Sequence, residues 1–205
     1  MSKRAGAVPE ETKAAILEAA REEFSVYGFQ KSSLRRICAA AGVTTGALYF
    51  FFKGKDDLFA SVIEQTTGLF NQLMAGHYQQ ERACPGHESE QGEDADYQIS
   101  RLLIAMYFQN RQTWDILLHH LDHPAVQRFL DDFVEKSTEH YVCLLQDASV
   151  EQIDRFAIHQ FVHMQVDSML TLISHDFTQM EMIAHAKIVI RMLRGAFRAL
   201  LTEEK

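Results

Sequence analysis

The sequence predicts an all-α fold with an N-terminal three-helix head and a C-terminal helical body. Its 205 residues include only three prolines and ten glycines. Long stretches place apolar residues at helical spacing, without the strict alternation that marks a half-buried strand. With 47% hydrophobic and 23% charged residues, the chain can form one substantial core or two small domains.

The first predicted helix covers residues 10–27. Pro9 suits a first helical turn, and Ile16, Ala20 and Phe24 share one apolar stripe. Gly28 is expected to end the helix. Because two short helices alone bury too little surface to be stable, this first helix should pack behind the two that follow.

Two short helices joined at Gly42 come next. Ser32 or Ser33 can cap the first of them, and Gly42 supplies the positive φ that ends it. Thr44 or Thr45 can cap the second, which therefore begins within three residues. Two helices joined so closely must cross, and this arrangement indicates a helix-turn-helix.

The same region carries short motifs in a fixed order and spacing. They are Leu34-Arg-Arg-Ile37, Ala41-Gly-Val43, Gly46-Ala-Leu-Tyr49, Phe52-Lys-Gly-Lys55 and Asp57-Leu58. Together with the preceding helix they cover roughly the first 60 residues, and the pattern resembles the DNA-binding segment of the tetracycline-repressor (TetR) family of transcriptional regulators. The resemblance implies a DNA-binding domain over residues 1–57 and a helical ligand-binding and dimerisation domain over residues 58–205.

The expected DNA contacts separate by residue type. Small or hydroxyl-bearing side chains at the leading end of the second helix can approach base edges and thymine methyl groups; they are Thr44, Thr45, Gly46 and Ala47. By resemblance, the phosphate contacts come from Ser33, Arg35, Tyr49, Lys53 and Lys55. Phe50 joins the DNA-binding set without an assigned partner. The family often has His or Tyr where this chain has Phe51, so one phosphate hydrogen bond is expected to be absent.

The net charge of -8 does not exclude DNA binding, because the charge is unevenly distributed. Residues 1–60 hold nine Lys or Arg against seven Asp or Glu, and the remainder holds 11 against 21. Charges farther away than a Debye length of about 8–10 Å are screened, so a small basic face can attract phosphates on an acidic protein.

Six further helices are expected in the body. Their ranges are 56–74, 97–112, 114–121, 126–146, 150–174 and 178–201. The acidic, turn-rich stretch between residues 76 and 96 is expected to be a surface loop, and residues 147–149 should break the chain again.

The last two helices are apolar over more than one stripe, which favours a four-helix bundle built from two helices of each subunit. The residues beyond the needs of one antiparallel pair are Met164, Met169, Leu172, Ile183, Ile190, Leu193, Phe197 and Leu200. All but Met164 are assigned to the dimer interface. The alternative is one large monomeric core, while the family resemblance also implies a homodimer on a double-stranded DNA operator.

An apolar pocket between helices of the body is a further expectation. Its candidate lining is Phe108, Trp114, Leu118, Phe129, Phe133, Tyr141, Phe161 and Met164. Plain core packing is the alternative for this aromatic set. The resemblance implies a small-molecule effector, largely apolar, that releases the DNA.

Metal binding and catalysis find less support in the sequence. His159 and His163 lie four residues apart on a predicted helix and could share an ion, but such histidines are mostly solvated or hydrogen-bonded. No metal ligand and no cofactor is assigned. No glycine-rich phosphate loop, nucleophile elbow or metalloprotease motif appears, so an enzyme is not expected.

The sequence features point to a cytoplasmic protein without membrane association. No segment reaches the length of about 18 apolar residues that a membrane helix needs, and the N-terminus lacks an apolar signal core. Cys38, Cys84 and Cys143 match neither a disulfide framework nor zinc-ligand spacing. The leading hypothesis is a ligand-responsive regulator acting as a repressor. The alternative is a small-molecule or histidine-based metal sensor with weak or no specific DNA binding.

Overall fold

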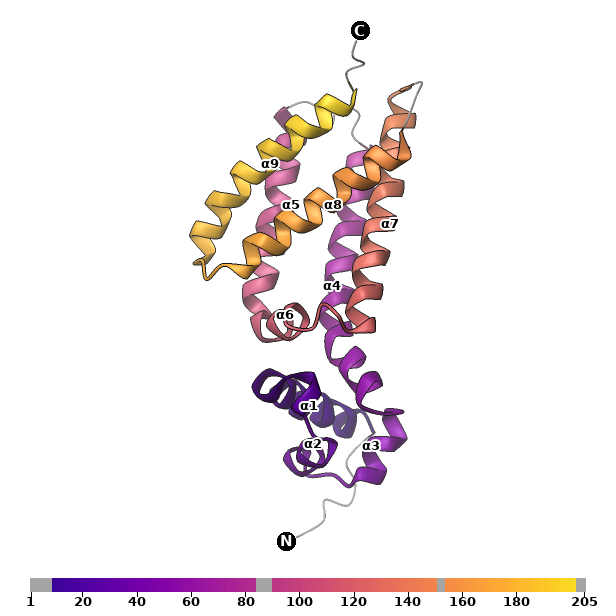
Figure 1. The fold of residues 1–205 in the computed structure, drawn as a ribbon, viewed down its shortest axis with the longest axis vertical. Helices are drawn as coiled ribbons and strands as arrows, with labels where there is room; N and C mark the ends of the chain where they lie inside the picture. Colours follow the sequence, from indigo (N-terminus) through magenta and orange to yellow (C-terminus); the bar gives the residue numbers. More distant parts are fainter. Residues whose placement is uncertain (1–8, 84–89, 151–153, 202–205) are drawn as a thin grey trace. The chain divides into compact units, whose positions relative to one another are not determined.

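The computed structural model describes residues 9–83, 90–150 and 154–201, and within these ranges every regular element is a helix (Figure 1). The helices are α1 (Pro9–Lys31), α2 (Leu34–Ala41), α3 (Thr45–Phe51), α4 (Lys55–Ala83), α5 (Glu90–Gln109), α6 (Arg111–Leu118), α7 (Pro124–Asp147), α8 (Arg155–Ser174) and α9 (Gln179–Leu201). The all-α prediction is confirmed. None of these helices, over its described residues, has the length and apolarity needed to span a bilayer.

The chain divides into two compact units. The first contains the described residues up to Gly68 together with Asn110–Gln127, and the second contains Leu69–Gln109 and the described residues from Arg128 onward. The sequence placed the boundary after residue 57 and assigned α6 to the body. In the structure α6 packs on α1. Just after α6, His120 Nε2 accepts from the backbone N–H of Phe29 at 2.8 Å, and no local sequence rule predicts a contact over this separation.

Aromatic side chains fill the centre of the first unit. Phe59, from α4, is fully buried. Its ring centroid lies 5.3 Å from that of Phe24 and 5.2 Å from that of Phe29, both at edge-to-face angles, and 4.2 Å from that of His123. This cluster joins α1, α4 and the segment after α6, so the helix-turn-helix rests on a support built from distant parts of the chain.

The regular part of α1 ends at Gly28, as predicted. Gly28 has φ 67° and ψ 173°, a conformation that is essentially restricted to glycine. The chain then turns once more before α2. The helix is therefore stopped by backbone geometry.

Several boundaries differ from the predicted ones, among them the start of α8, which lies at Arg155 instead of residue 150. α4 continues to Ala83, and α5 already begins at Glu90, so residues 90–96 are helical where a loop was expected. α6 begins at Arg111 instead of Trp114. The rest of the expected loop, residues 84–89, lies outside the described residues.

In the second unit, α9 packs against both α5 and α8 (Figure 1). Asp154 caps α8, its carboxylate accepting from the N–H groups of Phe156 at 2.9 Å and Ala157 at 3.2 Å. One apolar cluster holds the ends of α7, α8 and α9 together; its buried members are Val142, Leu145, Ile158, Phe161 and Phe197.

Candidate nucleic-acid interface and ligand cavity

The turn between α2 and α3 follows the predicted geometry. Gly42 is left-handed, with φ 67° and ψ 29°. Its N–H donates to Ala39 O at 3.3 Å, and the N–H of Val43 donates to Cys38 O at 2.9 Å. These bonds satisfy carbonyl groups at the end of α2, as in a Schellman motif. Thr44 is the N-cap of α3, since its hydroxyl oxygen accepts from the N–H of Ala47 at 3.2 Å.

The start of α2 differs from the expected serine cap. Ser33 occupies the N-cap position, but its side chain makes no capping hydrogen bond. Instead its backbone N–H donates to the Glu23 carboxylate of α1 at 2.7 Å. The Ser32 hydroxyl donates to Phe29 O at 2.6 Å. A residue ten positions earlier therefore accepts from the backbone N–H of the N-cap residue, and the Ser33 side chain caps none of the first-turn N–H groups.

Glu23 joins α1 to α2. Its side chain is 8% exposed and accepts from Arg36 Nε at 2.8 Å as well as from Ser33. Burial opposes ionisation of this carboxyl, but the hydrogen bonds from Arg36 and Ser33 and the charges of Arg36 and Lys55 outweigh burial and lower the pKa of Glu23 below its ordinary value. The ionised carboxylate thus stabilises the fold of the head.

Replacing Glu23 by glutamine is expected to destabilise the protein by roughly 1–3 kcal/mol at neutral pH, because charge-assisted hydrogen bonds are lost. A carboxyl with a lowered pKa contributes stability above its unfolded-state pKa and loses it as the pH falls through its folded-state pKa. The difference in free energy of unfolding between wild type and Glu23→Gln should therefore shrink on acidification. Urea denaturation from pH 7 to pH 3 measures it, and a pH-independent difference would contradict this role.

The outer face of α3 carries the expected base-reading residues. Thr45 and Gly46 are exposed at its leading end, and Ala47 is half-buried. Leu48 is fully buried and fixes the helix against its support. Tyr49 is 58% exposed.

Gly46 has no structural requirement within the protein. Its φ is not in the left-handed region, and a Cβ built on it would make only an ordinary contact of 3.8 Å with the Thr44 hydroxyl. The fold would therefore accept a larger side chain at position 46. The absence of a side chain there leaves room for a bound partner to approach the backbone closely.

The aromatic run at the end of α3 divides between core and surface. Phe52 is buried, as the pattern predicted, and Phe51 is half-buried. Phe50 is 79% exposed and packs edge-to-face on Phe51 with centroids 5.0 Å apart. A large apolar side chain thus projects beside Tyr49 on the face expected to contact DNA.

Two of the expected phosphate-binding cations are exposed, and a third is engaged by the protein. Arg35 and Lys53 lie on the surface. Lys55 Nζ donates to Gln30 O and Ser32 O, both at 3.1 Å, and sits 4.7 Å from the centroid of the Phe29 ring. Lys55 therefore fastens the start of α4 to the turn before α2, and its phosphate contact remains a prediction.

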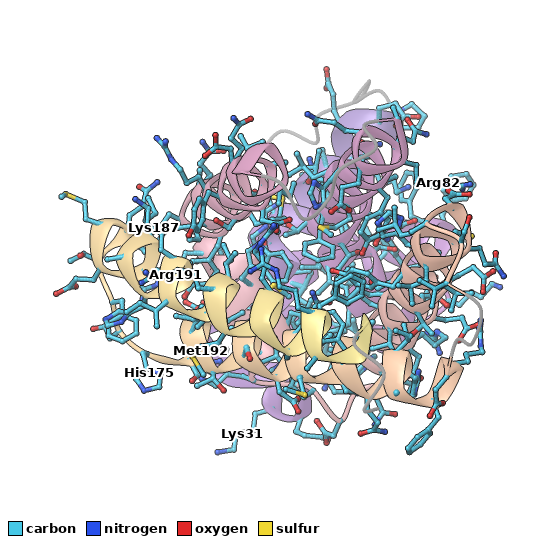
Figure 2. The ribbon with its side chains drawn as sticks, turned by 90° about the horizontal axis from the view of Figure 1, so that it is seen from above. Lys31, Arg82, His175, Lys187, Arg191 and Met192 are labelled. Carbon is cyan, nitrogen blue, oxygen red and sulfur yellow. The ribbon has the colours of Figure 1, made fainter. Side chains whose placement is uncertain are left out.

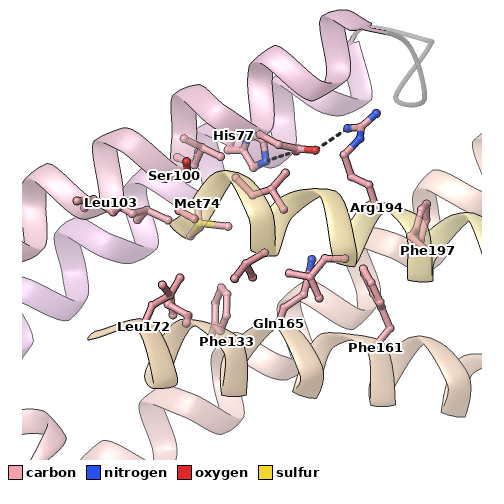
Figure 3. Close-up of a pocket in the computed structure, with 18 of the residues that line it drawn as sticks. Met74, His77, Ser100, Leu103, Phe133, Phe161, Gln165, Leu172, Arg194 and Phe197 are labelled. Carbon is pink, nitrogen blue, oxygen red and sulfur yellow. Dashed lines mark hydrogen bonds and ion pairs between the residues drawn. The ribbon is translucent and has the colours of Figure 1, made fainter. Parts of the chain in front are cut away.

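A cavity of about 220 Å³ lies within the second unit and is lined by side chains of α4, α5, α7, α8 and α9 (Figure 3). Of the expected pocket residues, Phe133, Tyr141 and Phe161 line it. The other five do not: Phe108, Trp114, Leu118, Phe129 and Met164.

The positions of those five residues have clear physical causes. Trp114 and Leu118 belong to α6 in the first unit. Phe129 packs edge-to-face on Phe70, and Phe108 on Tyr107. Met164 faces outward. Aromatic composition alone could not separate cavity wall from core.

Most residues assigned to the dimer interface also line this cavity. They are Met169, Leu172, Ile190, Leu193 and Phe197. Ile183 is half-buried beside α5, and the side chain of Leu200 lies outside the described part of the chain. The stripe that the sequence assigned to a partner subunit therefore faces the interior of its own subunit.

A different apolar stripe on α8 and α9 is exposed. On α9, Ile188 is 50% and Met192 69% exposed, four residues apart, with Arg191 beside them (Figure 2). On α8, Phe156 and Met164 are exposed. The helical spacing of Ile188 and Met192 was visible in the sequence, but periodicity could not tell which of two apolar stripes faces solvent.

The cavity has one polar end, formed by His77, Asp96 and Arg194 (Figure 3). Arg194 donates to Asp96 Oδ2 at 2.6 Å. No role was predicted for these residues from the sequence, because they come from three helices far apart in the chain. Elsewhere, Nε2 of His159 and Nε2 of His163 lie 3.1 Å apart, as the four-residue spacing allows.

Sequence matches to known proteins cover only part of the chain. Residues 16–62 match the family model of bacterial regulatory proteins, tetR family. The HTH-type transcriptional regulator AcrR of Shigella flexneri is 38% identical over 73 residues, and the repressor BepR of Brucella suis is 37% identical over 89 residues. These alignments span 36% and 43% of this chain, and only 34% and 43% of the two relatives.

Solved structures share the fold over nearly the whole chain. A TetR-family regulator from Syntrophomonas wolfei has a TM-score of 0.69 at 17% identity, covering 91% of this chain and 96% of its own. SmeT, the repressor of a Stenotrophomonas maltophilia multidrug efflux pump, has a TM-score of 0.68 at 19% identity, with 91% of each chain covered. FadR from Bacillus subtilis, solved with stearoyl-CoA, has a TM-score of 0.65 at 15% identity over 89% of this chain and 98% of its own.

Proposed function

Because residues 16–62 match the family model of bacterial regulatory proteins, tetR family, we propose that the chain is a ligand-responsive transcriptional regulator of this kind that acts as a repressor. It binds a pseudo-palindromic DNA operator as a homodimer, and a small, largely apolar molecule releases it. One observation carries the proposal: α3 exposes Thr45, Gly46 and Tyr49 on a helix that buried Leu48 holds in place.

Sequence readout is assigned to the leading end of α3. The Thr44 hydroxyl caps the helix, so Thr45 and Ala47 supply most of the side-chain contacts to base edges and thymine methyl groups. Gly46 lets the backbone approach the DNA closely. Phe50 is suited to apolar contact with thymine methyl groups or sugars beside these residues.

Phosphate contacts fix the register of the head on the duplex. Tyr49, Arg35 and Lys53 are exposed and suited to this role. Ser33 and Lys55 act at the junction of α1, α2 and α4, where Lys55 also donates hydrogen bonds to carbonyl groups of the turn.

Lys53→Ala is expected to weaken binding to all DNA sequences alike and to reduce the magnitude of the salt slope, d log K/d log[salt], by about one, because one phosphate contact is lost. Fluorescence anisotropy with operator and random duplexes at several salt concentrations measures both effects. Lys136→Ala removes the same charge from an exposed position on α7 and should leave the slope unchanged. Equal slopes in wild type and Lys53→Ala would remove Lys53 from the DNA interface.

A gel-shift titration on the region upstream of the protein's own gene tests the function itself. A specific complex at physiological salt, competed by operator and not by random DNA, supports the regulator. Its absence favours the alternative, a small-molecule or metal sensor whose head binds DNA weakly or not at all.

The homodimer is assigned to the exposed stripe of Phe156, Met164, Ile188 and Met192 on α8 and α9, which replaces the interface first expected from the sequence. Apolar patches of this kind are typical of protein–protein interfaces. Small residues flank the stripe on α9, where Ala184, Gly195 and Ala199 are exposed and permit close helix approach. A two-fold axis here would present two heads to operator half-sites about one DNA turn, roughly 34–36 Å, apart or somewhat more.

The effector is assigned to the cavity of the second unit. Its wall is mostly apolar, with aromatic rings from Phe133, Phe161 and Phe197 (Figure 3). Such a wall suits an apolar molecule, and the fold is shared with a repressor of a multidrug efflux pump and with a regulator solved with stearoyl-CoA. To release DNA, the effector must bind the DNA-incompetent state more tightly, since equal affinity for both states shifts nothing.

A further inference from the structure

Four side chains with metal-binding chemistry meet at the polar end of the cavity. His77 and Glu81 lie one helical turn apart on α4, with His77 Nε2 3.4 Å from Glu81 Oε2. Asp96 of α5 places Oδ1 3.9 Å from His77 Nε2. The ligand atoms of these three residues lie within 4.8 Å of one another. His140 of α7 approaches Glu81, with Nε2 2.7 Å from Oε2.

We propose that His77, Glu81 and Asp96 bind a divalent transition-metal ion, with Zn²⁺ the best match. One imidazole nitrogen and two carboxylate oxygens form a donor set that Zn²⁺ accepts. His140 holds the Glu81 carboxylate in position. The site is separate from the DNA-binding face and does not depend on the proposed function.

The distances favour ligands around a shared ion. Direct N–H···O hydrogen bonds measure about 2.7–3.2 Å. His77 Nε2 lies farther than that from Glu81 Oε2 and from Asp96 Oδ1. A zinc ion with bonds of about 2.0–2.2 Å holds tetrahedral ligands roughly 3.3–3.6 Å apart. The 3.4 Å separation lies in this range, the 3.9 Å separation needs a shift of a few tenths of an ångström, and the Glu81 and Asp96 oxygens lie within 4.8 Å of one another.

The surroundings fix the ligands. Arg194 binds Oδ2 of Asp96 and leaves Oδ1 on the side of His77 (Figure 3). The His140 contact restricts Glu81 in the same manner. Partners of this type orient metal ligands, and their loss typically lowers metal affinity about 10–100-fold.

Burial and charge also favour a cation. The side chains of His77, Glu81 and Asp96 are 9%, 6% and 19% exposed. Two carboxylates this far from water need compensating positive charge. Arg194 supplies one such charge. A divalent ion bound between the two carboxylates would add to it.

The His159 and His163 pair provides an internal control. These two histidines have the same four-residue spacing and a short Nε2 separation of 3.1 Å. Among the described residues, no third His, Cys, Asp or Glu joins them in a group that could hold a metal. They test whether an i, i+4 histidine pair alone binds the ion.

The experiment uses the full-length protein, stripped with a chelator and titrated with Zn²⁺ against a chromogenic zinc indicator. We expect one tight equivalent in wild type, loss of at least ~100-fold in affinity in Glu81→Gln and Asp96→Asn, and about 10–100-fold in His140→Gln. His163→Gln should bind as wild type. No tight equivalent in wild type, unchanged affinity in the Glu81 and Asp96 variants, or loss of the site in His163→Gln would each overturn the proposal.

Two further measurements keep the result interpretable. Circular dichroism establishes whether each variant is folded. If a carboxylate variant is unfolded, His77→Gln, whose side chain lies at the cavity wall, takes its place in the titration. Wild type should gain thermal stability with Zn²⁺ by mass action, and His77→Gln should not. Gel shifts with stripped protein test DNA binding separately, so failure of the metal site and failure of the regulator proposal are distinguishable.

Discussion

Ile188→Glu and Met192→Glu are each expected to convert the proposed homodimer into monomers and to lower operator affinity at least ~100-fold. In a two-fold interface each substitution is present twice, and both carboxylates lose water in an apolar contact. A monomer binds one half-site, so it loses the gain of about 10²–10⁴ that two linked heads provide. Multi-angle light scattering gives the mass, and anisotropy with full and half operators gives the affinity.

Leu102→Glu is the matched control for these variants. Leu102 is an exposed leucine on α5, in the same unit but outside the stripe on α8 and α9. It should remain dimeric and bind the operator as wild type does. If Ile188→Glu and Met192→Glu also stay dimeric, the exposed stripe is not the interface, and the assignment of Phe156 and Met164 fails with it.

The head could be predicted from sequence wherever local rules govern it. Gly42 and Thr44 act within a few residues of their own positions, so capping rules identify them. Glu23 could not be found in this way. It bonds Ser33 across ten residues, and nothing in the spacing distinguishes it from a solvated glutamate.

The body was less predictable because its helices are apolar on more than one side. Periodicity located α8 and α9 but could not separate the stripe at Leu193 and Phe197, which faces the cavity, from the stripe at Ile188 and Met192. Periodicity also could not predict the polar end of the cavity. His77 and Asp96 lie on different helices, and only the packing of α4 against its neighbours brings them together.

Phe59→Ala is expected to lower the free energy of unfolding by roughly 3–5 kcal/mol, the usual cost of removing a fully buried phenylalanine. Phe59 has no exposed surface, and its ring meets Phe24 and Phe29 of α1 and His123 of the segment between α6 and α7. The vacated space cannot collapse easily, because Phe24 and Phe29 are held by α1 and the backbone of His123 is held by hydrogen bonds with His120 and Val126. Urea denaturation followed by circular dichroism measures the loss.

Phe50→Ala removes the same side chain from a site where it is mostly exposed, and so separates folding from binding. Its effect on the free energy of unfolding should stay within about 0.5 kcal/mol, while operator affinity falls because an apolar contact on the α3 face is lost. Phe59→Ala should show the reverse. Its free energy of unfolding should fall strongly, while at urea concentrations below its unfolding transition the folded fraction should bind the operator with near-normal affinity. If Phe59→Ala unfolds at the same urea concentration as Phe50→Ala, the aromatic cluster is not what supports the helix-turn-helix.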